Sequence, residues 1–203
     1  MKVVIIDYGM GNIKSIISAL KYIGADDITL TSSSQDIINA DKLILPGVGS
    51  FAKAMHNINK LKLKEILTQA VIENKKPILG ICLGMQLMAE SSNEDGLNEG
   101  LNFVPAIVKK FEIENLKIPH VGFNQVVIPN DTRLYDGLDN LSDFYFTHSY
   151  RMTSNNKINQ AICEYGNGFI ASYEKDNIAG VQFHPELSQT NGLKLLKNFM
   201  DKF

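Results

Sequence analysis

This sequence lacks three features that each mark a class of protein: an excess of basic residues, a long apolar run and a set of cysteines. Lysine and arginine total 20 against 22 acidic residues, which gives a formal net charge of −2 and a pI near 6.1. Binding to the phosphate backbone of nucleic acids requires a basic surface. We therefore expect no nucleic-acid partner.

No apolar stretch approaches the roughly 20 residues that a membrane-spanning helix needs. The chain begins MKVVIIDYG, whose apolar part is too short for a signal-peptide core and ends at Asp7. We therefore expect a cytoplasmic protein with no membrane partner. A reducing compartment disfavours a disulfide between the two cysteines, Cys82 and Cys163, so each is interpreted alone.

What the sequence does contain is typical of a globular chain. Its 203 residues are 44% hydrophobic and 21% charged, which is enough to bury a substantial core and far from the composition of a disordered protein. We see no internal repeat, low-complexity tract or linker. The sequence predicts a single domain that spans residues 1–203.

The first half of the chain alternates short β-rich apolar runs with helical patterns. Strands are predicted at residues 2–7, 28–31, 42–46 and 77–81. Helices are predicted where apolar residues recur with helical spacing, at 13–23 before Gly24 and at 63–71. This alternation is typical of βαβ units around a parallel sheet.

From about residue 103 the pattern changes to short strands separated by Asn, Asp and Gly. The predicted strands lie within residues 103–111, 120–128, 143–150, 161–165, 168–177 and 178–185. We expect them to extend the sheet as a meander, and a closing helix from Leu193 to Phe203 to pack back on it. The predicted class is α/β, with a doubly wound, mostly parallel sheet and an antiparallel extension.

Cys82 stands at the carboxyl end of a predicted buried strand, between Gly80 and Gly84. A strand, a tight turn carrying a nucleophile and a helix make up the nucleophile elbow of serine hydrolases, here with a thiol. The crevice at strand carboxyl ends is where α/β sheets bind ligands, and the helix dipole there favours a thiolate. The alternative is a small buried apolar residue.

A nucleophilic thiol needs a base and a group that orients the base. In VQFHPE, His184 and Glu186 are two apart, and an extended segment would project both side chains from one face. His184 could then accept the thiol proton while Glu186 holds the imidazole. A His-x-Glu pair taken alone is usually structural, and Cys82 is what makes this one a candidate.

The intermediate of such a reaction needs backbone N–H groups that face its developing oxyanion. The loop LPGVGSF follows the third predicted strand, and Gly47 and Gly49 would let an N–H near Val48 turn inward. Leu83 offers a second N–H. The alternative is a plain strand-to-helix turn.

Taken together, LPGVGSF, GICLGMQ, THSY and FHPE resemble the triad-type, class I glutamine amidotransferases. DYGMGN and IPHVGFNQ are similar in particular to the glutaminase subunits of imidazole glycerol phosphate synthase, from histidine biosynthesis. The resemblance extends from Asp7 to the closing helix. It implies a flavodoxin-like amidotransferase fold and a Cys82, His184 and Glu186 triad that hydrolyses glutamine to glutamate and ammonia.

The resemblance also assigns roles to other positions. Val48 and Leu83 match the oxyanion hole. The positions that match substrate-binding residues of the family are Gly47, Gly49, Gln86, Glu94, His148, Ser149 and Tyr150. Gln86 and Glu94 could instead be helix-surface residues. Neither the resemblance nor the spacing of His56 and His120 points to a metal, and we expect no cofactor.

The partner that the resemblance implies is a cyclase subunit with a (βα)8 barrel, which takes the ammonia to make imidazole glycerol phosphate and an aminoimidazole carboxamide ribonucleotide. Two positions depart from the usual pattern of this heterodimer. Leu187 stands where a lysine commonly pairs with the cyclase, and Phe123 where tryptophan is frequent. Both departures leave the identity of the partner open.

Two alternatives therefore remain. One is a paralogous subunit that supplies ammonia for amidation of a surface-glycan sugar. The other is a non-catalytic scaffold with the amidotransferase fold, which would have no need of Cys82, His184 and Glu186 together.

Overall fold

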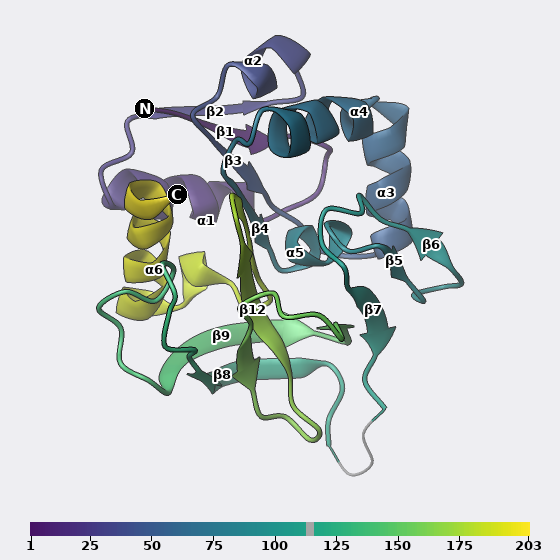
Figure 1. The fold of residues 1–203 in the computed structure, drawn as a ribbon, viewed down its shortest axis with the longest axis vertical. Coiled ribbons are helices and arrows are strands. Elements are labelled where there is room, and N and C mark those ends of the chain that lie inside the picture. Colours follow the sequence, from purple (N-terminus) through teal and green to yellow (C-terminus); the bar gives the residue numbers. More distant parts are fainter. Residues whose placement is uncertain (113–115) are drawn as a thin grey trace.

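The computed structural model describes residues 1–112 and 116–203, and it contains two sheets with helices packed around them (Figure 1). The larger sheet has nine strands in the order β2-β1-β3-β4-β13-β12-β11-β8-β9. Its strands are β1 (Lys2–Ile6), β2 (Asp27–Thr31), β3 (Lys42–Leu45), β4 (Ile78–Ile81), β8 (His120–Val127), β9 (Ser142–His148), β11 (Ala161–Cys163), β12 (Phe169–Lys175) and β13 (Ile178–Val181).

Strands β2, β1, β3, β4 and β13 run parallel, and the others extend the sheet in antiparallel fashion. This arrangement confirms the predicted class. The order 2-1-3-4 followed by a fifth parallel strand is that of flavodoxin-like sheets. Every residue of β3, β4 and β13 is buried, as expected for parallel strands covered on both faces.

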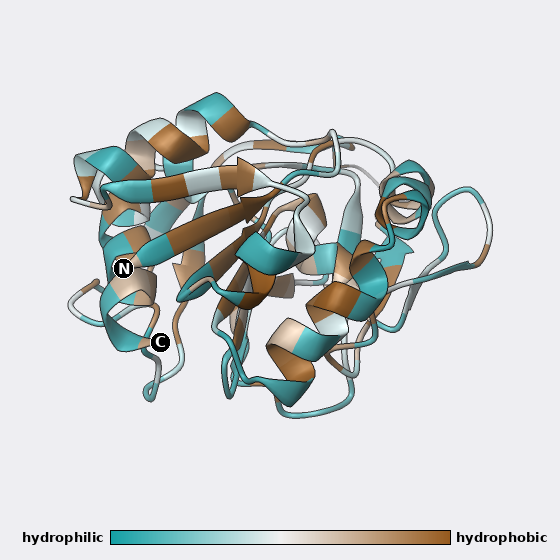
Figure 2. Ribbon diagram, turned by 90° about the horizontal axis from the view of Figure 1, so that it is seen from above, coloured by the Kyte–Doolittle hydropathy of each residue, from teal (hydrophilic) through white to brown (hydrophobic). Residues whose placement is uncertain are grey.

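Helices cover both faces of the parallel part. They are α1 (Ile13–Tyr22), α2 (Ser34–Ile38), α3 (Phe51–Lys60), α4 (Leu63–Thr68) with a π-helical turn at Gln69–Glu73, α5 (Leu83–Leu87) and α6 (Gln189–Lys202). Alternate residues of β1 face opposite sides: Val3 and Ile5 pack in the core under α1 and α6, and Val4 and Ile6 in the core under α3 and α4. Figure 2 shows these central strands as the apolar layer between the more polar helices.

The predicted helix at 13–23 is confirmed as α1, which is followed by Gly24 in a left-handed conformation at φ +91°. Glycine suits this position because it has no Cβ to clash there. The predicted closing helix is confirmed as α6, and the helix predicted at 63–71 begins at Leu63 as expected.

One part of the predicted meander is wrong. Within residues 103–111, only β7 (Ile107–Lys110) is a strand, and it joins a separate four-stranded sheet of order β10-β7-β5-β6. The other strands are β5 (Ser91–Ser92), β6 (Asn98–Glu99) and β10 (Tyr150–Thr153). The chain leaves the main sheet after β9, because β10 pairs with β7 instead of continuing along β8.

The fold brings the carboxyl ends of β3, β4 and β13 together near the ends of β9 and α5 (Figure 1). Such an edge is where open α/β sheets bind ligands. Among the described residues, no helix is both long and apolar enough to cross a membrane.

Candidate active site

Cys82 is the residue that connects β4 to α5, and its backbone has φ 54° and ψ −111°. This conformation is strained for any residue that carries a Cβ. The two glycines beside it allow the close packing that holds the turn. A Cβ on Gly84 would lie 1.8 Å from the Leu45 carbonyl oxygen, and one on Gly80 would lie 2.7 Å from the Met85 backbone.

The Cys82 sulfur is nearly buried, with 7% of the residue exposed. It lies 3.9 Å from the backbone oxygen of Thr147 and 3.8 Å from Nε2 of Gln182. The Cys82 N–H donates to the Val181 oxygen at 2.8 Å, which continues the pairing of β4 with β13. The turn is therefore fixed to the strand that leads into His184.

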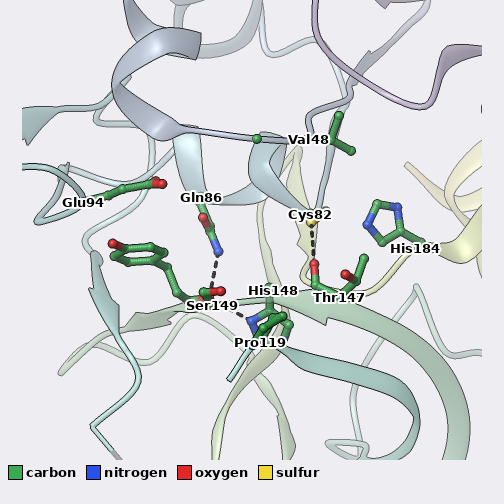
Figure 3. Close-up of a pocket in the computed structure, with 11 residues that line it drawn as sticks. Val48, Cys82, Gln86, Glu94, Pro119, Thr147, His148, Ser149 and His184 are labelled. Carbon is green, nitrogen blue, oxygen red and sulfur yellow. Dashed lines mark hydrogen bonds between the residues drawn. The ribbon is translucent and has the colours of Figure 1, made fainter. Parts of the chain in front are cut away.

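A pocket of about 310 Å³ opens above Cys82 (Figure 3). Its volume is at the lower end of the range for small-molecule sites. It is lined by Val48, Gly49, Cys82, Gln86, Glu94, Pro119, Thr147, His148, Ser149, Tyr150 and His184. Figure 3 shows the Cys82 sulfur between Thr147 and Val48, with His184 on one side and Gln86 and Glu94 on the other.

His184 and Glu186 meet as the sequence predicts, but by a different local geometry. Nδ1 of His184 lies 2.9 Å from Oε1 of Glu186. The segment is not extended, because Pro185 begins a 3₁₀ turn over Pro185–Leu187 and proline favours the first helical position. The turn is anchored at both ends: the His184 N–H donates to the Tyr145 oxygen at 2.8 Å, and the Ser188 hydroxyl donates to the His184 oxygen at 2.6 Å.

The carboxylate of Glu186 is fully buried and fixes the orientation of the imidazole. Its Oε1 also accepts a hydrogen bond from Nδ2 of Asn12 at 3.3 Å, from the residue that precedes α1. Because Glu186 accepts at Nδ1, the other ring nitrogen of His184 is left facing the thiol side. That Nε2 atom is buried and has no hydrogen-bond partner among the residues that the structure describes.

The two histidines of this pocket have opposite electrostatic surroundings. Burial lowers the pKa of His184, but the charges of Cys82 and Glu186 and the hydrogen bond to Glu186 outweigh it and raise that pKa to about 10. Burial lowers the pKa of His148 to about 3. Opposite shifts of this kind separate a proton-accepting group from one that stays neutral.

His148 is held in place by hydrogen bonds at both ring nitrogens. Nδ1 lies 2.8 Å from the Tyr150 oxygen, and Nε2 lies 3.1 Å from Nδ1 of His120. Since the carbonyl can only accept, Nδ1 of His148 carries the hydrogen and Nε2 accepts from His120. Burial also lowers the pKa of His120, to about 4. Neutral rings thus tie β8 to the end of β9.

Gln86 is buried with 4% exposed, so it is not a helix-surface residue. Its Nε2 donates to the Tyr150 oxygen at 3.0 Å and to Oε1 of Gln182 at 2.7 Å. An amide nitrogen carries two hydrogens, and both are engaged here. A ligand in the pocket could therefore meet Gln86 only at its carbonyl oxygen.

The other predicted substrate-binding residues on the far side of the pocket are Glu94, Ser149 and Tyr150, which are half-buried. Glu94 lies in the loop between β5 and β6, and its Oε2 accepts from the Phe51 N–H at 2.9 Å, at the start of α3. Burial raises the pKa of Glu94. One carboxylate oxygen thus stabilises a helix start while the side chain borders the pocket.

The predicted oxyanion loop lies beside Cys82, but only part of it borders the pocket. Val48 is 41% exposed and Gly49 has φ +99°, and both line the pocket. Gly47 and Leu83 are not in the pocket wall within the described residues. A Cβ on Gly47 would lie 2.7 Å from the Tyr8 hydroxyl, so this glycine serves close packing.

Leu83 has a buried side chain and is the first residue of α5. The first N–H groups of a helix lack intrahelical acceptors. The N–H of Leu83 is therefore a donor next to the sulfur even though its side chain points into the core.

Sequence reasoning missed five residues at this site. Pro119 and Thr147 line the pocket, Gln182 contacts Cys82, and Asn12 contacts Glu186. The Tyr8 hydroxyl donates to the Pro46 oxygen at 2.6 Å. Gln182 had a signal, since it stands two residues before His184 within VQFHPE. Thr147 is the first residue of the motif THSY. The rest depend on contacts between distant parts of the chain.

Cys163 is completely buried, and burial raises its pKa to about 12, so it is a residue of the core. In the parts of the chain that the structure describes, no group of three or more His, Cys, Asp or Glu side chains is placed to hold a metal ion.

A thiol on a strained strand-to-helix turn thus lines the same pocket as an imidazole that is held by a buried carboxylate. A model of the class-I glutamine amidotransferase family matches residues 4–203. The chain belongs to this family.

Several individual proteins are similar to this chain over nearly its whole length. The chain is 49% identical over 199 residues to imidazole glycerol phosphate synthase subunit HisH 1 of Campylobacter jejuni (strain RM1221), covering 98% of each chain. It is 46% identical to subunit HisH 2 of Vibrio vulnificus, covering 99% of this chain and 94% of that one. It is 41% identical to subunit HisH of Aquifex aeolicus, covering 100% and 97%.

Solved structures agree on the fold. A glutamine amidotransferase from Thermotoga maritima matches with a TM-score of 0.67 at 15% identity, covering 98% of this chain and 96% of that one. The glutaminase domain of Trypanosoma brucei CTPS with bound acivicin matches with a TM-score of 0.69 at 15% identity, covering 100% and 95%. At these identities the likeness concerns the fold alone.

Proposed function

We propose that this chain is the glutaminase subunit of an imidazole glycerol phosphate synthase, with Cys82, His184 and Glu186 as its catalytic triad. The observation that carries the triad is that Cys82, at a strained turn, lines the same pocket as His184, whose buried Nε2 has no hydrogen-bond partner in the part of the chain that the structure describes. The full-length similarity to HisH subunits supports the choice of enzyme.

In the proposed reaction, His184 accepts the thiol proton at Nε2 and the sulfur of Cys82 attacks the side-chain carbonyl carbon of glutamine. The C–N bond then breaks, His184 returns the proton to the leaving nitrogen, and ammonia departs from a thioester. Water, deprotonated by His184, attacks the thioester to release glutamate and the thiol. Glu186 stabilises the imidazolium in both steps through its 2.9 Å contact.

The oxyanion of each tetrahedral intermediate would be stabilised by backbone N–H groups. The N–H of Leu83, at the start of α5, is one candidate. The peptide next to Val48 is the other, in the exposed loop beside Cys82. Removing one such donor typically raises the barrier by about 3 kcal/mol.

Glutamine would be held by the opposite wall of the pocket. The carboxylate of Glu94 suits the ammonium group of the substrate, because charge-assisted hydrogen bonds are the strong ones. The carbonyl oxygen of Gln86, whose N–H groups are both engaged, can accept a further hydrogen bond from the substrate. Ser149 and Tyr150 border the same space, and His148 holds the Tyr150 backbone in place.

The ammonia acceptor would be a cyclase subunit that docks over the pocket mouth, in a cytoplasmic heterodimer. Val48, Val121, Phe123 and Leu187 are large apolar residues with 41 to 56% of their surface exposed. Phe123 packs edge-on against Tyr145 at 5.5 Å, and the Tyr145 backbone is bonded to His184 and Ser188. Phe123 and Leu187 therefore both adjoin the region where β9 contacts the turn that carries His184. Exposed apolar side chains close to one another favour a protein partner.

The second candidate is the paralogous subunit that supplies ammonia for amidation of a surface-glycan sugar. The observation that favours it is Leu187, an exposed apolar side chain directly after the triad, which cannot form an ion pair with a cyclase. Tagged protein from its native cells separates the two candidates. Co-purification of the histidine-pathway cyclase supports the first, and of a paralogous cyclase the second.

Glutamate release tests the activity itself. With the purified partner, the protein should produce glutamate from glutamine, and a Cys82→Ala variant should not. A glutamine-derived diazoketone should modify Cys82 and leave Cys163 unmodified. Glutamate release no higher than that of Cys82→Ala would favour a non-catalytic scaffold. Modification of Cys163 in place of Cys82 would contradict the assignment of the site.

A further inference from the structure

One contact of the Cys82 sulfur belongs to none of the roles described so far. Gln182 is completely buried and follows β13, next to the carboxyl end of β4. The pairing of Val181 with Ile81 places it beside Cys82. Its Nε2 lies 3.8 Å from the sulfur, and its Oε1 lies 2.7 Å from Nε2 of Gln86.

The orientation of the Gln182 amide follows from a backbone carbonyl. The Tyr150 oxygen can only accept, so the Gln86 atom that faces it at 3.0 Å must be the nitrogen. That same nitrogen faces Gln182 and must donate to an oxygen there. The nitrogen of Gln182 is therefore the atom turned toward the sulfur. Only this orientation of the two side-chain amides satisfies both hydrogen bonds of the Gln86 nitrogen.

The two hydrogen-bonding contacts of the sulfur favour different protonation states. The Thr147 carbonyl at 3.9 Å can accept from an S–H but repels a thiolate. The Gln182 N–H at 3.8 Å donates, and a donor stabilises the charged form of an acid. When the proton passes to His184, only the Gln182 contact remains favourable. In this buried surrounding, such a hydrogen bond gains strength because water does not compete for it.

We propose that Gln182 is the hydrogen-bond donor that stabilises the Cys82 thiolate, and that Gln86 acts as the positioning residue that turns the Gln182 amide toward the sulfur. The inference rests on the proposed role of Cys82 as nucleophile. Gln182 is not among the described residues that line the pocket. Its loss should therefore lower kcat with little change in KM for glutamine.

The test measures the thiolate directly, without turnover. The rate of iodoacetamide alkylation of the Cys82 peptide is followed by mass spectrometry from pH 5 to pH 10 in the full-length chain. In Gln182→Met, which keeps the length of the side chain and removes the donor, the midpoint should rise by about one pH unit, so that alkylation below the wild-type midpoint is slowed about tenfold. Gln35→Met, an exposed glutamine on α2, is the matched control and should match wild type.

A role for Gln182 in packing alone predicts something different. In that case Gln182→Met would change the melting temperature and leave the alkylation midpoint of the folded protein at the wild-type value, which would overturn the proposal. If Gln182→Met does not fold, Gln182→Glu takes its place, because it has the same shape and lacks a donor when ionised. The same two outcomes, a raised or an unchanged alkylation midpoint, then decide between the roles. The alkylation experiment contains no glutamine, so its result does not depend on the glutaminase test. If the midpoint shifts but the wild-type protein releases no glutamate, the proposed thiolate contact stands and the proposed function is wrong.

Discussion

The two walls of the pocket hold their reactive groups by different means. The cysteine wall, residues 45–94, fixes Cys82 through backbone geometry: a positive φ and glycines packed against neighbouring backbone. The histidine wall, residues 119–188, fixes His184 through hydrogen bonds to Glu186, Tyr145 and Ser188. The first wall depends on shape, and the second on donors and acceptors.

This difference teaches where each wall is sensitive. A single added methyl group should damage the cysteine wall, because backbone atoms have nowhere to move. The histidine wall should tolerate changes of shape better than the loss of one hydrogen-bonding group, since a buried group left without a partner is costly. Three sets of substitutions and a pH series test this comparison.

The largest expected effect comes from removing the side chain of Cys82 or of His184, one from each wall. Cys82→Ala and His184→Ala should each reduce kcat for glutamine hydrolysis by about 10⁴-fold or more, and the double variant should be no slower than either single one. Residues that act as one unit are non-additive in this way. Steady-state glutamate release with the partner present measures all three. Multiplied losses in the double variant would mean that the walls act separately.

Glu186→Gln tests the histidine wall alone. The amide keeps the shape but can present a donor to Nδ1 of His184, which disturbs the tautomer, so kcat should fall by about 10³-fold to 10⁴-fold. The pKa of His184 should fall as well, because the buried carboxylate contributes to its rise. NMR titration of the His184 ring reports the shift. Asn12→Ala, which removes only the 3.3 Å contact to Glu186, is the milder comparison. An unchanged kcat in Glu186→Gln would remove Glu186 from the triad.

Gly84→Ala tests the cysteine wall alone. The new methyl group would lie 1.8 Å from the Leu45 oxygen, so the free energy of unfolding should fall by about 4 kcal/mol. Gly122→Ala in β8 is the control, because a Cβ there meets nothing within 4 Å and only its φ of +129° is unfavourable. Its cost should be about 1 to 2 kcal/mol. Urea denaturation of both variants measures the difference, and equal costs would contradict the steric argument.

The pH series examines the histidine wall at its buried pair. The folded pKa values of His120 and His148, about 4 and about 3, lie below the ordinary value of 6.5. The unfolded chain therefore binds protons that the folded chain does not. Their stabilising effect is complete above about pH 6.5 and is lost as pH falls toward 4, at up to about 1.4 kcal/mol per pH unit for each ring.

Urea denaturation between pH 7 and pH 5 measures this slope. His120→Asn should reduce the slope by the share of one ring, and His56→Asn, at an exposed site on α3, should leave it unchanged. An equal slope in His120→Asn and wild type would mean that His120 does not remain neutral in the folded chain.

The sequence predicted those parts of the molecule that depend on local patterns. Runs of β-branched residues located β1, β3 and β4, and apolar spacing located α1 and α6. Cys82 was found because glycines flank it at a strand end, and His184 and Glu186 because they lie two residues apart.

What the sequence could not predict depends on distant contacts or on short elements. Strands β5 and β6 have two residues each, too few to show a period, so the second sheet was missed. The contact of Asn12 with Glu186 joins residues 174 apart in the chain. The strand pattern predicted an extended segment at Pro185, but the structure has a 3₁₀ turn there, because proline favours the first position of a helix.

The backbone at position 82 has a consequence for how the enzyme could have evolved. A conformation at φ 54° and ψ −111° suits glycine better than any residue with a side chain. A chain with Cys82→Gly should therefore be inert yet unfold at a higher temperature, by the few degrees that correspond to about 1 kcal/mol. Random mutation followed by selection for heat resistance alone would then tend to erase the nucleophile.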